Sequence, residues 1–260
     1  MLPEAYPSAA SNGPEISPHA QAPRNSSEST KNCGRNARAD DMQGGPGDRD
    51  RRHLNYDYSR YAGLDYAEFY EVMLSRMRPA PPILELGSGL GYFLECARRH
   101  GMSAVGIELS AEGIAAGAPR RLAVVRADLT LPLPFKDEAF GSAFAHHVLE
   151  HMLRETERRV LRETRRVLRP GGFLFVVSPN PHVQAAHDDP DHINLFTPHE
   201  LREELLATGY RKVSLGTNYW RPVWERHLHL GVAGNLLSGA LWKVMPIDRF
   251  AATSSAMAWK

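Results

Sequence analysis

Hydrophobic residues along the chain follow two alternating patterns, short continuous apolar runs and longer segments with helical spacing. The runs predict five buried strands, at residues 83–86, 103–108, 122–127, 140–145 and 172–177. Between them, apolar positions recur three and four residues apart, most clearly from residue 148 to residue 168. The other face of that segment carries arginines interleaved with glutamates, Glu157 among them, and is expected to face solvent. Strands that alternate with helices predict an α/β protein with a doubly wound, Rossmann-like sheet, mostly parallel, with helices on both faces.

The first 52 residues depart from this pattern. They are rich in Pro, Ser, Asn, Gly, Ala and charged residues and contain almost no large apolar ones. Such a segment cannot bury enough surface to offset its ordering entropy. We therefore expect a disordered tail at residues 1–52, an ordered ligand-binding domain at residues 53–217, and a C-terminal cap or interaction segment at residues 218–260.

The C-terminal segment contains an apolar stretch rich in small residues, from residue 228 to residue 245. Asn235 and Lys243 interrupt it, and it is too short and too polar to span a membrane. We expect it to cap the ligand site or to form a contact in a homodimer, with a monomer as the alternative. Contact with a membrane surface is the less favoured reading.

Charge and cysteine content narrow the class of protein. The chain has 31 Lys and Arg against 30 Asp and Glu, a formal net charge of +1, which does not favour a nucleic-acid partner. Cys33 and Cys96 lie far apart, so no disulfide framework is predicted. The N-terminus lacks the apolar region of a secretory signal. These features predict a cytoplasmic protein.

A glycine-rich turn follows the first predicted strand. Gly87, Gly89 and Gly91 occupy alternate positions, and an amphipathic segment comes directly after them. Strand, glycine turn and helix together bring backbone N–H groups and a helix N-terminus up to a ligand. Dinucleotide sites usually space their glycines as Gly-x-Gly-x-x-Gly, but here the third glycine comes one residue early and Tyr92 stands in its place. The turn alone therefore predicts a nucleotide-like ligand without deciding which one.

Polar side chains end the next three predicted strands. Glu108, Asp128 and His146 each follow an apolar run. Ligands of doubly wound sheets bind outside the carboxyl ends of the strands. A carboxylate there can accept hydrogen bonds from both vicinal hydroxyls of a ribose. Tyrosines at positions 56, 58 and 61 either cover one end of the sheet or close over this ligand.

Several motifs in the same order make residues 83–213 resemble the class I S-adenosylmethionine-dependent methyltransferases, closest to the small-molecule branch of type 11 or type 23. The motifs are residues 85–91 (ELGSGLG), 106–110 (GIELS), 127–129 (ADL) with 133–135 (LPF), 148–151 (VLEH), 166–172 (RVLRPGG) and 192–198 (HINLFTP). Two departures stand out. Gly141 occupies a position that is commonly Asp in the family, which could loosen the start of the fourth strand, and the family's C-terminal hairpin is not evident in residues 218–260.

The resemblance implies S-adenosylmethionine as the cofactor and a set of residues that bind it. In that set, backbone near Gly87 and Gly89 lies at the methionine end, Glu108 accepts from the ribose, and Asp128 accepts from the adenine amino group. The full set is Glu85, Gly87, Ser88, Gly89, Gly91, Glu108, Leu109, Asp128, Leu129 and His146. The domain at residues 53–217 is then an S-adenosylmethionine-binding methyltransferase domain.

Histidines near the end of the fourth strand raise two further possibilities. His147 to His151 fits the His-x-x-Glu-His pattern of some zinc hydrolases. The resemblance already accounts for Glu150 and His151, and no third ligand cluster stands out at zinc spacing, so no metal is predicted. His146 and His192 are the candidate catalytic residues, with a structural or cofactor-lining role as the alternative for His146.

The sequence therefore predicts an enzyme that transfers a methyl group to oxygen, nitrogen or carbon of a small-molecule acceptor. Two alternatives stay open, a nucleotide-cofactor oxidoreductase on the same fold and a non-catalytic S-adenosylmethionine-binding module. No motif identifies the acceptor.

Overall fold

The computed structural model describes residues 58, 66–217 and 231–260. The predicted disordered tail lies outside the described residues, as do the tyrosines at positions 56 and 61 and the first part of the apolar C-terminal stretch.

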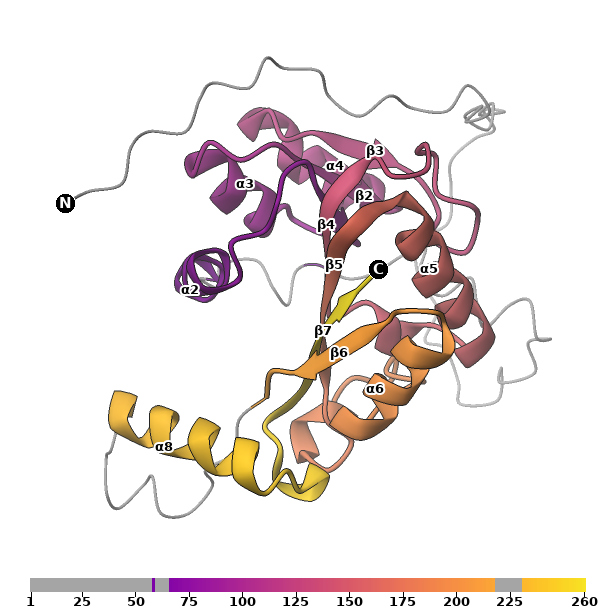
Figure 1. Ribbon diagram of the computed structural model, residues 1–260. Helices are drawn as coiled ribbons and strands as arrows, with labels where there is room; N and C mark the ends of the chain where they lie inside the picture. Colours follow the sequence, from indigo (N-terminus) through magenta and orange to yellow (C-terminus); the bar gives the residue numbers. More distant parts are fainter. Residues whose placement is uncertain (1–57, 59–65, 218–230) are drawn as a thin grey trace, which may run out of the picture.

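A seven-stranded sheet forms the centre of the molecule, in the order β3-β2-β1-β4-β5-β7-β6 (Figure 1). The strands are β1 (Ile83–Leu86), β2 (Ala104–Glu108), β3 (Val124–Arg126), β4 (Phe140–His146), β5 (Leu168–Pro179), β6 (Lys212–Leu215) and β7 (Thr253–Trp259). Strands β1 to β5 pair in parallel, and β7 is antiparallel to β5 and β6. The chain moves outward from β1 to β3 and then crosses back to β4, so the strand order reverses between β1 and β4. The predicted doubly wound fold is confirmed, and such a reversal is where these sheets bind ligands.

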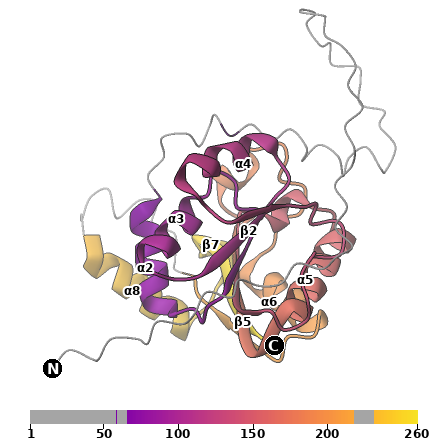
Figure 2. The same ribbon diagram turned by 90° about the horizontal axis from the view of Figure 1, so that it is seen from above.

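Helices cover both faces of this sheet (Figures 1 and 2). They are α2 (Ala67–Met77), α3 (Tyr92–Arg99), α4 (Ala111–Gly117), α5 (Arg154–Val167), α6 (Pro198–Ala207) and α8 (Gly231–Val244), with short 3-10 turns η3 (Ala118–Arg120), η4 (Leu149–His151), η5 (Gln184–His187) and η6 (Asp248–Phe250). Helices α2 and α3 lie on one face, and α5 and α6 lie on the other. None of the described helices is long and apolar enough to cross a membrane.

The two faces of the sheet bury separate apolar clusters. Leu84 and Leu86 of β1 pack with Val160 and Leu161 of α5 on one side. Ile83 and Phe144 pack with residues of α2 and α3 on the other side. Alternate residues of β1 thus point to opposite faces, as the pleat requires, and the strand is buried along its whole length.

The last strand overturns one expectation. Residues 253–259 form β7, which inserts between β5 and β6 and pairs with both, so the expectation that no hairpin partner follows the sixth strand is wrong. The alternating small residues of this segment gave a weak strand signal. The sheet therefore uses residues on both sides of the boundary predicted at residue 217, and α8 lies between its last two strands in the sequence.

The start of β4 has a physical reason for its glycine. A Cβ on Gly141 would lie 2.5 Å from the carbonyl oxygen of Ala80. The Gly141 N–H donates to the Pro82 carbonyl at 3.0 Å, and the Ser142 hydroxyl donates to the Ala80 carbonyl at 2.6 Å. Close backbone approach, rather than a looser strand, explains this departure from the family pattern.

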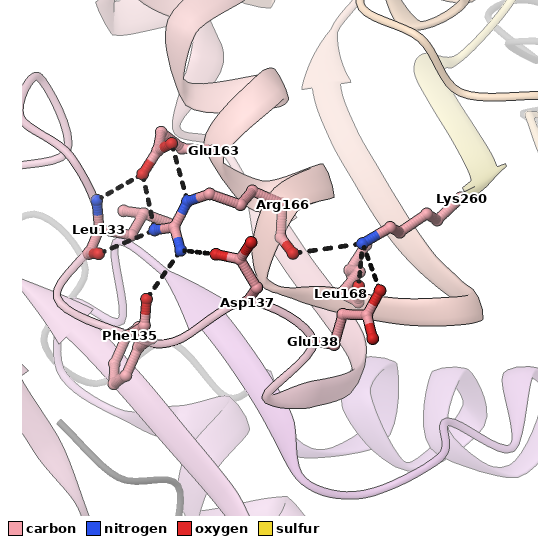
Figure 3. A network of polar contacts seen from close by, with 8 residues as sticks. All are labelled: Leu133, Phe135, Asp137, Glu138, Glu163, Arg166, Leu168 and Lys260. Carbon is pink, nitrogen blue, oxygen red and sulfur yellow. Dashed lines mark hydrogen bonds and ion pairs between the residues drawn. The ribbon is translucent and has the colours of Figure 1, made fainter. Parts of the chain in front are cut away.

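A polar network fixes the connection between β3 and β4 (Figure 3). The Arg166 guanidinium donates to Glu163, to Asp137 and to the carbonyls of Leu133 and Phe135, at 2.7–3.0 Å. The Lys260 ammonium donates to the Leu168 carbonyl at 2.7 Å. The end of α5 is thereby tied to the segment that follows the carboxyl end of β3 and to the end of β7.

Candidate active site

A cavity of about 560 Å³ opens at the carboxyl ends of the parallel strands. Residues that follow β1, β2, β3, β4 and β5 line it, and so does the start of the antiparallel strand β7, which lies at the same edge. The predicted site residues that line it are Glu85, Gly87, Ser88, Gly89, Glu108, Leu109, Asp128, Leu129, His146 and His192. The fold therefore brings together side chains that the sequence separates widely.

Gly91 is the predicted site residue that does not line the cavity. It caps the N-terminus of α3 with φ 78°, and a Cβ there would lie 2.5 Å from Leu122 Cδ1. Its position is explained by backbone conformation and by packing against Leu122, so its predicted contact with a cofactor is not supported.

Internal hydrogen bonds set the shape of the glycine turn. The N–H of Ser88 donates to the Ile107 carbonyl at 2.9 Å, that of Gly89 to Glu108 Oε2 at 2.7 Å, and that of Gly91 to the Ser88 carbonyl at 2.8 Å. Gly87 and Gly89 both have positive φ, which glycine adopts without strain. These three N–H groups already donate hydrogen bonds within the protein, so they stabilise the turn and are not available to a ligand.

Glu108 is the most fully bonded carboxylate of the site. Its Oε1 accepts from the N–H groups of Leu109 and Ser110 at 2.8 and 2.7 Å, and its Oε2 accepts from Gly89. The Tyr58 hydroxyl also hydrogen-bonds to it, and burial together with the Glu108 charge raises the pKa of Tyr58. These contacts fix the carboxylate where the glycine turn, β2 and the cavity meet.

Two polar groups at the glycine turn lack protein partners. Glu85 Oε2 and Ser88 Oγ are buried and have no hydrogen-bond partner among the described residues. Burial, and then the charge of Glu108, raise the pKa of Glu85 well above its usual range, because both disfavour the charged form. Both residues line the cavity. This end of the cavity thus offers a polar ligand a hydroxyl and a carboxyl group.

Asp128 lies at the end of β3, half-buried, with one oxygen engaged. Its Oδ1 accepts from the Thr130 N–H at 2.8 Å. Leu109 and Leu129 lie next to Glu108 and Asp128 in the sequence and add apolar surface to this part of the cavity. A carboxylate beside apolar side chains suits the polar edge of a planar ring.

Aromatic side chains surround His146. Its ring stacks on Phe69 at 4.9 Å between centroids, and the Tyr70 hydroxyl lies 3.1 Å from its Nδ1. Burial, and then the nearby His147, lower the pKa of His146 well below its usual range. The imidazole is therefore neutral at neutral pH. Tyr66 and Tyr92 line the same wall, with their ring centroids 5.9 Å apart.

A second group of polar residues lies beyond the ends of β4 and β5. Glu150 is fully buried, and its Oε1 lies 2.8 Å from Nδ1 of His147. Burial tends to raise the pKa of Glu150, but the hydrogen bond from His147 and the charges of His147 and His151 outweigh this effect and leave the pKa below its usual value. The ring centroids of His151 and His192 lie 4.9 Å apart, and both residues line the cavity.

Comparison with known proteins agrees with this geometry. Residues 84–176 match a family model described as a methyltransferase domain. A demethylmenaquinone methyltransferase of Mycobacterium tuberculosis is 33% identical over 101 residues, which are 39% of this chain and 42% of that protein. A probable S-adenosylmethionine-dependent methyltransferase of the same species is 29% identical over 157 residues, 56% of each chain. The crystal structure of a SAM-dependent methyltransferase from Archaeoglobus fulgidus has a TM-score of 0.58 at 19% identity, covering 78% of this chain and 97% of that one.

The chain contains a class I S-adenosylmethionine-dependent methyltransferase domain. The family predicted from the motifs is thereby confirmed. The chain spans less than half of the demethylmenaquinone methyltransferase and little more than half of the other relative. Helix α2 and the segment from residue 180 to residue 194 lie outside the matched residues 84–176.

Several residues that line the cavity of this methyltransferase domain were not predicted. Asn180 is buried, and its amide donates to the carbonyls of Asp248 and Ala251 at 2.7 and 2.8 Å. Tyr66 precedes the first residue of α2 and Tyr70 lies within this helix, whereas the prediction of a tyrosine over the sheet or the ligand concerned positions 56, 58 and 61. His147 and His151 carried a motif signal, but it was assigned to the family pattern rather than to the site.

Proposed function

We propose that the protein transfers a methyl group from S-adenosylmethionine to oxygen, nitrogen or carbon of a small-molecule acceptor. The observation that carries this proposal is the meeting of Glu85, Ser88, Glu108 and Asp128 at one cavity of a methyltransferase domain. The cavity, about 560 Å³, falls within the range of small-molecule sites, about 300–1,000 Å³.

The polar groups along the cavity match the polar groups of the cofactor in order. Ser88 and Glu85, each with one buried oxygen that lacks a partner among the described residues, would bind the methionine end beside the N-terminus of α3. Glu108 would accept from a ribose hydroxyl, and Asp128, through the oxygen that Thr130 leaves open, from the adenine amino group. When bound, the cofactor supplies a methyl group on a positively charged sulfur.

The aromatic wall around His146 suits the reacting end of that cofactor. The faces of aromatic rings attract cations, and Tyr66, Tyr70 and Tyr92 line the cavity next to the glycine turn. The neutral His146 can hold the acceptor through a hydrogen bond without placing a like charge beside the sulfonium. The chain's task in methyl transfer is chiefly to orient the two reactants and exclude water.

The acceptor would bind among elements that the family model does not cover. Helix α2 and the loop with His192 both line the cavity, and neither belongs to residues 84–176. The demethylmenaquinone of the mycobacterial relative is therefore not proposed as the acceptor here. The cytoplasmic location and the choice between monomer and homodimer stay predictions.

Binding of the reaction product to the purified protein tests this proposal. S-adenosylhomocysteine should bind at one site by isothermal titration calorimetry, and NAD should show no saturable heat. Transfer of radiolabelled methyl from S-adenosylmethionine into a pool of small metabolites should then depend on the protein. Binding of NAD in place of S-adenosylhomocysteine would favour an oxidoreductase, and product binding without transfer to any acceptor would favour a non-catalytic binding module.

A further inference from the structure

Three side chains that can ligate a metal meet beyond the carboxyl ends of β4 and β5. Glu150 and His151 belong to η4, and His192 belongs to the segment after η5. One ligand atom of each, a carboxylate oxygen and two ring nitrogens, lie within 4.8 Å of one another. His151 and His192 line the cavity, whereas Glu150 lies buried behind them.

Hydrogen bonds to backbone carbonyls orient both imidazoles. His192 Nδ1 lies 2.8 Å from the Ala186 carbonyl oxygen, and His151 Nδ1 lies 3.2 Å from that of Asp191. A carbonyl oxygen only accepts, so each Nδ1 carries a proton, and Nε2 is the ring nitrogen left to ligate a metal. Histidines that ligate metals are typically held by such a bond from the other ring nitrogen.

The carboxylate is oriented as well, and one of its oxygens is left over. His147 engages Glu150 Oε1 at 2.8 Å, but Glu150 Oε2 is buried and has no hydrogen-bond partner among the described residues. Leaving a buried carboxylate oxygen without a donor is costly, so such an atom indicates a missing partner. A cation bound to this oxygen would remove that cost.

The backbone holds the two halves of the cluster together. The N–H groups of Ile193 and Asn194 both donate to the Glu150 carbonyl, at 2.9 and 3.0 Å. These bonds keep the segment that carries His192 against η4. The cluster is thus built by the fold and does not depend on flexible surface side chains meeting by chance.

We propose that Glu150, His151 and His192 bind a divalent transition-metal ion of the zinc type. Two imidazoles and one carboxylate are a ligand set that zinc uses in catalytic sites, where a further position stays open. Because His151 and His192 line the cavity, that position faces it. No metal was predicted from the sequence, because His192 is far from Glu150 and His151 along the chain and approaches them only through the fold.

The ion also narrows the class of acceptor, an extension that rests on the proposed function. An ion open to the cavity binds oxygen ligands, so the acceptor would be a small molecule with a hydroxyl or phenolic oxygen next to the transferred methyl group. The metal site itself does not need this extension, because its ligands and their orientation stand apart from the residues proposed to hold the cofactor.

Metal titration of the chelator-treated full-length protein tests the site directly. Calorimetry should show that one equivalent of Zn²⁺ binds. Co²⁺ should give the visible absorption spectrum of a site with a low coordination number and with nitrogen and oxygen ligands. Glu150→Gln, which keeps the side-chain shape, and His192→Ala should each weaken Zn²⁺ binding by at least about tenfold. His187→Ala is the matched control: it removes a histidine of the same segment, bonded to the Pro181 carbonyl and outside the cluster, and should leave the affinity unchanged.

Two further measurements distinguish an absent metal site from a misfolded variant and from an incorrect proposed function. The circular dichroism spectrum of His192→Ala should be the same as that of the wild type, so lost metal binding cannot be ascribed to unfolding. Acetohydroxamate, a small oxygen ligand, should change the Co²⁺ spectrum of the wild type. Absence of saturable Zn²⁺ binding, or equal affinity in the wild type, Glu150→Gln and His192→Ala, would overturn the metal site. Metal binding without any binding of S-adenosylhomocysteine would overturn the proposed function and leave the metal site standing.

Discussion

Two buried glutamates are held in different ways: Glu108, which lines the cavity, and Glu150, which lies behind the cavity-lining His151 and His192. Glu108 accepts three backbone N–H bonds, two of them from the residues that directly follow it, and it also bonds to Tyr58. Glu150 has one oxygen bonded to His147 and one with no partner among the described residues. The fold itself satisfies the first carboxylate, whereas the second is left for something that the described chain does not supply. This difference makes Glu108 a fixed hydrogen-bond acceptor for an organic ligand and Glu150 a candidate metal ligand.

The largest expected effect is at the satisfied carboxylate. In Glu108→Gln an amide N–H₂ replaces one oxygen, so a donor faces backbone N–H groups and the charge is lost. We expect S-adenosylhomocysteine affinity to fall by about 2–4 kcal/mol, since hydrogen bonds to charged groups are among the strongest. Calorimetry measures the change.

Glu112→Gln is the matched control for that substitution. Glu112 lies in the first turn of α4, a few residues after Glu108, and is exposed. It should change the affinity by less than about 0.5 kcal/mol. An affinity in Glu108→Gln within threefold of the wild type would remove Glu108 from the cofactor site.

The contrast between these glutamates also shows what the sequence could and could not predict. Gly87 and Gly89 lie in the turn after β1, and Glu108 is the last residue of β2; strand ends meet at one edge of a parallel sheet, so pattern and spacing were enough to predict these residues. His192 was predicted at the site, but its approach to His151 depends on the fold, and so do the bonds from Asn180 to the carbonyls of Asp248 and Ala251; no local pattern records these contacts. Residues at strand ends could be assigned to the site from the sequence, whereas the side chains that distant segments bring together could not be paired with one another.

The same limit applies to secondary structure and burial. The small residues of β7 carry little hydrophobic signal, and their place between β5 and β6 is set by partner strands distant in the sequence. Glu157 was expected on a solvated helix face, and this expectation was wrong: it is fully buried. Its neighbours on that face fit better, since Arg158 pairs with Glu204 of α6 at 2.7 Å.

Glu157 tests whether an unsatisfied buried carboxylate always indicates a ligand. Both of its oxygens are buried without a partner among the described residues, and it is not part of a metal-ligating cluster there. Burial, and then the charge of Glu204, raise its pKa to about 7. This carboxyl group can therefore avoid the cost of a buried charge by keeping its proton, and we expect no metal ion to bind Glu157.

The expected consequence is a pH dependence of stability. The folded pKa of Glu157 lies above the unfolded value, so the folded state retains a proton that the unfolded state releases. The associated stability is complete below the unfolded pKa, about 4.3, and is lost as pH rises to the folded pKa of about 7. Glu157→Gln should remove this loss, so its stability relative to the wild type should rise by about 2–3 kcal/mol between pH 4.5 and pH 8.

Urea unfolding at the two pH values measures this difference. Glu155→Gln, on the exposed side of the same helix, should follow the wild type at both values. A constant difference between Glu157→Gln and the wild type across the range would show that Glu157 does not change its protonation on folding.

A smaller effect is expected at Asp128, which keeps one oxygen open to the cavity. Its Oδ1 bonds to the Thr130 N–H, and this bond shapes only the local turn. Asp128→Ala should weaken S-adenosylhomocysteine binding by about 1–3 kcal/mol, the usual cost of a lost buried polar partner. Adenosine affinity should fall in parallel if Asp128 accepts from the adenine. Unchanged affinity for both ligands would remove Asp128 from the site.

The smallest expected effect is a gain in ligand affinity, and it arises from the hydrogen bonds that Glu108 already accepts. A carboxylate has about four lone-pair positions, and backbone N–H groups take three of them. The Tyr58 hydroxyl competes for the remaining position, which a ribose hydroxyl would need. Tyr58→Phe keeps the ring against Gly89 but removes the competitor, so S-adenosylhomocysteine affinity should rise by about 0.5–1 kcal/mol.

A double-mutant cycle decides whether this gain acts through Glu108. In the Glu108→Gln background, the substitution Tyr58→Phe should no longer raise the affinity, because the shared acceptor is gone. A gain that persists in that background would place the competition elsewhere. If Tyr58→Phe weakens binding instead, the Tyr58 hydroxyl contacts the ligand. Glu108 then accepts from the ribose in place of one of its hydrogen bonds from the backbone, and its hydrogen bond with Tyr58 is kept.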